Sequence, residues 1–117
     1  MVGPEKSLSR DELLEEMLWA INAIKDLAAQ GGERRLRQDP QFRYAMAFLW
    51  LRLGEPANQL IRRRLVGDAM ALRWQYLSAA RNQLAHERNQ DLGYLLLWRQ
   101  IEASSEVTAV DVSTLLY

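Results

Sequence analysis

Residues 39–64, DPQFRYAMAFLWLRLGEPANQLIRRR, contain the clearest helix signals in the chain and decide its fold class. Asp39 can accept hydrogen bonds from the free N–H groups of a helix N-terminus, and Pro40 suits the first helical position. The apolar residues that follow recur at helical spacing. They predict a helix whose buried stripe consists of Phe42, Ala45, Phe48, Leu49 and Leu53.

We expect this helix to kink before it ends near Arg64, because Pro56 cannot donate to the carbonyl of Arg52. Capping and periodicity signals of the same kinds predict three further helices. They run from Ser9 to Gly31, from Asp68 to about His86, and from Asp91 to about Ser104. Short polar connections between amphipathic helices favour an all-α, antiparallel bundle of four to five helices.

The residues outside these helices are predicted to form a linker and the two ends of the chain. Residues 1–8 are expected to form a flexible leader, residues 9–104 the bundle, and residues 31–38 a linker within it. Residues 105–117 are rich in β-branched side chains, and a single strand has no partner in a helical chain. We therefore expect these residues to form a C-terminal tail that is disordered or docks on a neighbour.

Composition excludes several classes of protein. The 117 residues include no cysteine and one histidine, and 15 basic residues balance 15 acidic ones. A disulfide framework, a thiolate metal site and a two-histidine metal site within one chain are therefore excluded, and we expect no cofactor. The chain has neither a signal peptide nor an apolar run long enough for a membrane helix, which predicts a soluble, cytoplasmic protein.

The only histidine lies in the sequence RNQLAHERNQ, residues 81–90, near the end of the third predicted helix. Asn82 and His86 are one helical turn apart and share a face, which the long side chain of Arg81 can reach. A histidine can move a proton near neutral pH, an arginine can bind a phosphate, and an asparagine can orient a reacting oxygen. These three residue types suit cleavage of RNA, in which the 2′-hydroxyl of the RNA itself acts as the nucleophile. The alternative is structural, because a histidine near a helix C-terminus also complements the helix dipole.

RNA cleavage of this kind needs two groups that transfer protons. With one histidine per chain, a two-fold homodimer is the simplest way to supply a pair. Glu87 could instead be the second group, although adjacent helical residues point about 100 degrees apart.

The string Arg81-Asn82-Gln83-Leu84-Ala85-His86 resembles the R-N-x-x-x-H signature of HEPN domains, specifically the HepT-like toxins. Further resemblance lies in the stretch Leu53-Gly54-Glu55-Pro56-Ala57, in the region of Trp74, and in the segment with Asp91 and Trp98. Together these stretches extend over most of residues 9–104.

The resemblance implies a metal-independent endoribonuclease toxin that acts as a homodimer and is paired with a minimal nucleotidyltransferase antitoxin. It implies catalytic roles for Arg81, Asn82 and His86 in a cleft between two copies. HepT-like proteins often carry a tyrosine two residues after the histidine, which the antitoxin adenylylates. This chain has Arg88 there, so control by that modification is in question.

Several other residues are candidates for RNA binding through their charge. They are Arg88, the run Arg62, Arg63 and Arg64, and the run Arg34, Arg35 and Arg37. The structural alternative for Arg62–Arg64 is a favourable position at a helix C-terminus. Glu55 could line the cleft or pair with Arg52. A core or dimer face suits most of the large aromatic residues better than a base-stacking platform does. These residues are Trp19, Trp50, Trp74, Trp98, Tyr44, Tyr76 and Tyr94.

Two other functions stay open on the sequence alone. One is a non-catalytic helical adaptor that binds a nucleotidyltransferase partner, and the other is an RNA-binding protein without turnover.

Overall fold

The computed structural model describes residues 7–86 and 93–117, and within these ranges every regular element is a helix. The all-α bundle predicted from the sequence is therefore confirmed. The helices are α1 (Arg10–Ala28), α2 (Gly32–Gln38), α3 (Pro40–Arg62), α4 (Asp68–Arg73), α5 (Gln75–His86) and α6 (Tyr94–Leu116). None of these helices is both long enough and apolar enough to span a bilayer.

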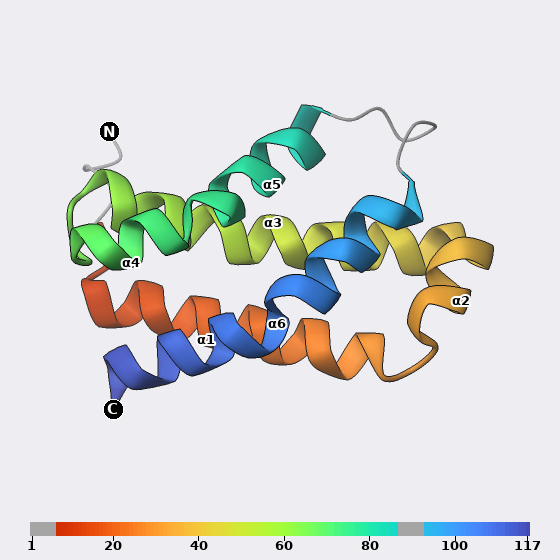
Figure 1. Cartoon of the computed structure of the whole chain (residues 1–117), viewed down its shortest axis with the longest axis horizontal. Helices are drawn as coiled ribbons and strands as arrows, with labels where there is room; N and C mark the ends of the chain where they lie inside the picture. The colour runs from red at the N-terminus through yellow and green to blue at the C-terminus, as the bar shows by residue number, and fades with distance from the viewer. Residues whose placement is uncertain (1–6, 87–92) are drawn as a thin grey trace, which may run out of the picture.

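The long helices α1 and α3 form the centre of the bundle, and α6 packs mainly on α1 (Figure 1). Helix α5 packs on α3 and rises away from it towards its own C-terminal end (Figure 1). Helices α2 and α4 are short connections at opposite ends of the bundle (Figure 1). The result is a scaffold in which α5 has one side on the core and one side in solvent.

Helix α1 begins as the sequence predicts. The Ser9 hydroxyl accepts from the backbone N–H of Glu12 at 3.1 Å, and the Glu12 carboxylate accepts from the backbone N–H of Ser9 at 3.1 Å. This capping box satisfies two donors that a helix N-terminus leaves free. One side of the helix is buried, with Leu13, Leu14, Met17, Ala20, Ile21 and Ile24 at 0% exposure.

The buried stripe of α3 differs in part from the one predicted. Phe42 and Leu53 are buried, whereas Ala45 is exposed and Phe48 is 57% exposed. The core side is formed by Phe42, Met46, Ala47, Trp50, Leu53, Ala57 and Leu60. Two apolar stripes share this helix, and only its neighbours decide which is covered. The helix continues as one element through Pro56 and ends at Arg62, near the predicted end at Arg64.

The predicted linker 31–38 is wrong, because residues Gly32–Gln38 form α2. Leu36 is fully buried and anchors this short helix to the core. Gly32 has a φ of 56°, a left-handed conformation that suits glycine and turns the chain out of α1.

The single helix predicted from Asp68 to His86 is divided into α4 and α5 at Trp74. The Trp74 side chain is fully buried, and its indole Nε1 donates to the Asp111 carboxylate at 3.3 Å. Arg73 donates to the same carboxylate at 2.8 Å. The break between α4 and α5 therefore lies beside Asp111, a buried hydrogen-bond acceptor on α6.

The predicted end of the last helix near Ser104 is also wrong, because α6 continues to Leu116. Thr108 and Val112 are 0% exposed and Asp111 is 7% exposed, so residues expected in a tail belong to the core. The apolar and β-branched side chains of this segment are covered by tertiary packing, which overrides their weak preference for strands.

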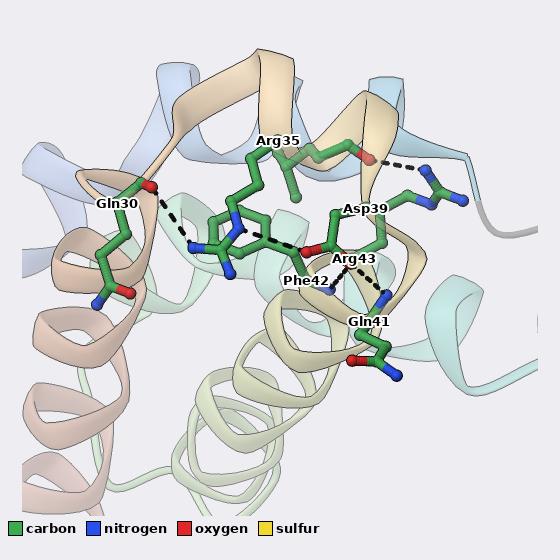
Figure 2. A network of polar contacts seen from close by, with 7 residues as sticks. Gln30, Arg35, Asp39, Gln41, Phe42 and Arg43 are labelled. Atoms are coloured by element: carbon green, nitrogen blue, oxygen red, sulfur yellow. Dashed lines mark hydrogen bonds and ion pairs between the residues drawn. The ribbon is translucent and has the colours of Figure 1, made fainter.

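A network of polar contacts joins α2 to α3 (Figure 2). Asp39 caps α3 by accepting from the N–H groups of Gln41 at 3.0 Å and Phe42 at 3.3 Å. Arg35 pairs with Asp39 at 3.4 Å, and its guanidinium lies 4.4 Å from the centre of the Phe42 ring. Arg43 donates to the last carbonyls of α2, those of Leu36 and Arg37, at 2.8 and 2.9 Å.

We expect the stabilisation by Asp39 to be lost in acid. The Phe42 N–H, with further contributions from Arg35 and Gln41, lowers the pKa of Asp39 from its ordinary value of 3.8. A lowered folded-state pKa gives stability that is full above the unfolded pKa and is lost as the pH falls through the folded one. Asp39→Asn keeps a side-chain cap but cannot titrate. The stability difference between parent and variant, measured by urea unfolding, should shrink between pH 6 and pH 3; an unchanged difference would contradict this role.

Candidate functional site

The outer side of α5 carries two of the candidate site residues predicted from the sequence. Leu77, Ala80 and Leu84 place the opposite side of the helix on the core. Asn82 and His86 are both exposed and lie one turn apart on the outer side, as predicted. His86 is the last residue of α5, so its imidazole lies at the open end of the helix.

Arg81 links this outer side to α3. Its Nη1 donates to the Oδ1 of Asn82 at 2.8 Å, and its Nη2 lies 2.8 Å from the Oε2 of Glu55. The Arg81 side chain is 35% exposed and that of Glu55 is 44% exposed. An arginine has five N–H donors in a planar fork, so these two contacts orient the guanidinium and leave it donors for a ligand.

Gly54 allows α3 and α5 to approach each other closely at this site. A Cβ on Gly54 would lie 2.5 Å from the Cβ of Arg81 and 2.9 Å from the carbonyl oxygen of Leu77. Both neighbours belong to the backbone or to the base of a side chain and cannot swing away. The Gly-Glu pair thus has two functions, since the glycine admits α5 and the glutamate holds Arg81.

Gly54→Ser is therefore expected to lower the free energy of unfolding by about 1–3 kcal/mol, as is usual for overpacking. Gly67→Ser is the matched control, because a Cβ at Gly67 meets nothing within 4 Å. Gly67 is also the N-cap of α4, where serine is favoured. Denaturant unfolding should give a lower free energy of unfolding for Gly54→Ser than for the parent, and an unchanged or higher one for Gly67→Ser. Equal free energies for the two variants would show that α3 and α5 can accommodate a side chain at Gly54.

The arginine run at the end of α3 is not part of this cluster. Arg62, Arg63 and Arg64 are exposed, and Arg63 donates to the carbonyl oxygen of Leu8 at 2.8 Å. Helices α3 and α5 are antiparallel, as shown by the contacts of Ser78 with Asn58 and of Arg81 with Glu55. The C-terminal end of α5 with His86 therefore points away from the arginine run.

The remaining charged candidate residues named from the sequence lie on α2 or outside the described residues. Arg88 lies outside the described residues, as do Glu87 and Asp91. Arg34 and Arg37 are exposed on α2, whereas Arg35 is engaged in the contacts of the α2–α3 junction (Figure 2).

The partner of Glu55 is one feature that the sequence did not settle. Of the two predicted roles, pairing with Arg52 is not what the structure has, because Glu55 pairs with Arg81 on another helix. The signal was the Gly-Glu pair itself, since a glycine inside a helix often marks a close approach of another backbone. Without the packing of α5, its partner could not be named.

Chemically, Arg81 and Asn82 place an oriented guanidinium beside an amide, and His86 adds an exposed imidazole one turn beyond Asn82 on α5. A guanidinium can bind a phosphate through two parallel hydrogen bonds, and an imidazole can accept or donate a proton near neutral pH. Comparisons of the chain with protein-family models, curated proteins and solved structures gave no match.

Proposed function

We propose that the chain is a metal-independent endoribonuclease of the HEPN type, with Arg81, Asn82 and His86 as its catalytic residues. The observation that carries the proposal is the position of these three residues on α5. Asn82 and His86 are exposed together, and Arg81 is held between Asn82 and Glu55 at 2.8 Å from each. The resemblance of residues 81–86 to the R-N-x-x-x-H signature supports the same assignment.

The proposed reaction uses the 2′-hydroxyl of RNA as the nucleophile. A base removes the proton of this hydroxyl, its oxygen attacks the adjacent phosphorus, and the bond to the 5′-oxygen breaks as an acid protonates that oxygen. The products are a 2′,3′-cyclic phosphate and a 5′-hydroxyl. His86 supplies one of the two proton transfers, Arg81 binds the phosphate, and Asn82 orients a reacting oxygen.

The second proton-transfer group would come from His86 of another copy, so the active form is a two-fold homodimer with the site in the cleft between copies. In the cell, we propose that the protein is a cytoplasmic toxin neutralised by a minimal nucleotidyltransferase. Arg88 in place of the usual tyrosine suggests that neutralisation acts through binding rather than through adenylylation of that position.

An adaptor without catalysis is the second candidate, and one surface favours it. Val107 and Val110 on α6 are 49% and 62% exposed. They border a hollow of about 320 Å³ that is also lined by Arg73, Glu106 and Asp111. Such an exposed apolar patch with a polar rim is typical of a protein–protein contact. Stable association with a nucleotidyltransferase, together with absence of RNA cleavage, would favour the adaptor.

The test of the nuclease is incubation of the purified chain with RNA in excess EDTA, with the product ends identified. The proposal expects cleavage that EDTA does not reduce, 2′,3′-cyclic phosphate ends, and a dimeric mass by light scattering. Cleavage that requires an added divalent ion, or that yields 3′-hydroxyl ends, would overturn the mechanism.

A further inference from the structure

The outer side of α3 carries a row of exposed side chains that the core does not explain. Tyr44 is 43% exposed, so it is not part of the core of this chain, one of the two places predicted for it. Phe48 is 57% exposed, and Arg52 is also exposed. These residues are spaced four apart, so each lies about 6 Å along the helix from the next, on one side of α3. Within residues 7–86 and 93–117, Arg52 makes no hydrogen bond or ion pair.

This row runs alongside the Arg81 cluster. Phe48 precedes Glu55 by seven residues, which places the two on the same side of α3, about 10 Å apart along the axis. Glu55 contacts Arg81. Because α5 is antiparallel to α3, its segment from Arg81 to His86 runs in the direction of Phe48 while it rises away from α3 (Figure 1). The centre of the row on α3 therefore lies about 10 Å along the helix from Glu55, the residue that holds Arg81.

We infer that Tyr44, Phe48 and Arg52 bind single-stranded RNA and guide it to the Arg81 site, an inference that rests on the proposed function. Exposed aromatic rings stack on bases without regard to sequence, and a nearby cation binds the phosphates. Only an unpaired strand offers free base faces to such rings, because bases in a duplex are already stacked on each other. The inferred substrate class is thus single-stranded RNA.

Charge favours RNA over a second copy of the chain as the occupant of this row. Arg52 has no anionic partner within the described residues, and RNA supplies one at every phosphate. A two-fold contact of this row with its own copy would offer Arg52 no carboxylate, because Tyr44, Phe48 and Arg52 include none. Association through this row is therefore an outcome that the test must distinguish.

Binding is measured in the His86→Ala background, so that the RNA is not consumed. The probe is a fluorescein-labelled, unstructured single-stranded RNA of about 12 nucleotides, within the range of known single-strand sites. Phe48→Ala is expected to weaken its binding about tenfold, because the variant loses one ring on which a base stacks. Trp19→Ala is the matched control, because Trp19 is also 57% exposed but lies on α1. It should bind as the His86→Ala parent does.

A second variant tests the cation independently of the rings. Arg52→Gln should reduce the slope of log Kd against log salt concentration by about 0.7, the contribution of one phosphate contact in a single strand. A blunt RNA duplex of the same length should bind more weakly than the single strand and be insensitive to Phe48→Ala.

Equal affinities of the Phe48→Ala and Trp19→Ala chains, or no binding of single-stranded RNA at all, would overturn the inference. A Phe48→Ala chain that becomes monomeric with unchanged affinity would assign the row to a second copy and would also overturn it. Stacking-dependent binding without cleavage by the chain that retains His86 would refute the nuclease while leaving the RNA-binding row in place.

Discussion

A chain truncated after Ser104 is expected to lose cooperative folding. The segment that is removed supplies Thr108 and Val112, both 0% exposed, and Asp111, which is 7% exposed. Burial of one valine side chain contributes about 1.5–3 kcal/mol. Asp111 also accepts from Arg73 and from the buried Trp74, whose indole would lose its acceptor. The summed loss is comparable to the total stability of a small domain, about 5–15 kcal/mol.

Thermal unfolding followed by circular dichroism measures this effect. Removal of Tyr117 alone is the control, because this side chain is 93% exposed and should change the free energy of unfolding by less than about 0.5 kcal/mol. The stability of the Asp111→Ala chain should lie between those of the two truncated chains. Its free energy of unfolding should fall by about 1–3 kcal/mol, because the buried indole N–H of Trp74 loses its acceptor. A truncated chain that unfolds cooperatively at the Tm of the parent would show that residues 105–117 are a tail after all.

His86→Ala is expected to reduce kcat/KM for RNA cleavage by about 10²–10⁴-fold, the usual contribution of a general acid or base. The fold should be retained, because His86 is exposed at the last position of α5. Gln83→Ala is the matched control: Gln83 is exposed on the same helix and does not belong to the proposed catalytic set. It should cleave RNA at the rate of the parent.

A site shared between two copies allows a second measurement, whose result would not change if His86 had only a structural role. If each site uses imidazoles from two copies, an excess of the His86→Ala chain should lower the activity of a fixed amount of parent as mixed dimers form. Full activity of the His86→Ala chain would refute the proposed catalytic role of this residue. Undiminished parent activity after exchange of subunits would refute the shared site while leaving catalysis within one copy open.

The sequence predicted best where local chemistry is sufficient. The capping box of Ser9 and Glu12 and the Asp39-Pro40 start of α3 need only neighbouring residues, and both are observed. Spacing on one helix also placed Asn82 and His86 together, because a helical turn fixes which residues share a side. The all-helical class follows from the same local signals.

Tertiary packing decided the rest. The outward position of Phe48, the burial of Asp111 and the partner of Glu55 each depend on a second helix that local sequence does not reveal. A β-branched segment became the end of α6, since burial against the bundle outweighs a propensity of a few tenths of a kcal/mol per residue, on the order given by host measurements.

By itself, then, the sequence determined that this chain is helical and where α1, α3 and α4 begin, and it named the side chains that are candidates for phosphate chemistry. Only the three-dimensional structure decided which face of α3 is covered and that Gly54 brings α5 close enough for Glu55 to hold Arg81. The physical reason is that caps and periodicity act within a few residues of the chain. Burial and ion pairing act between residues that are close only after folding.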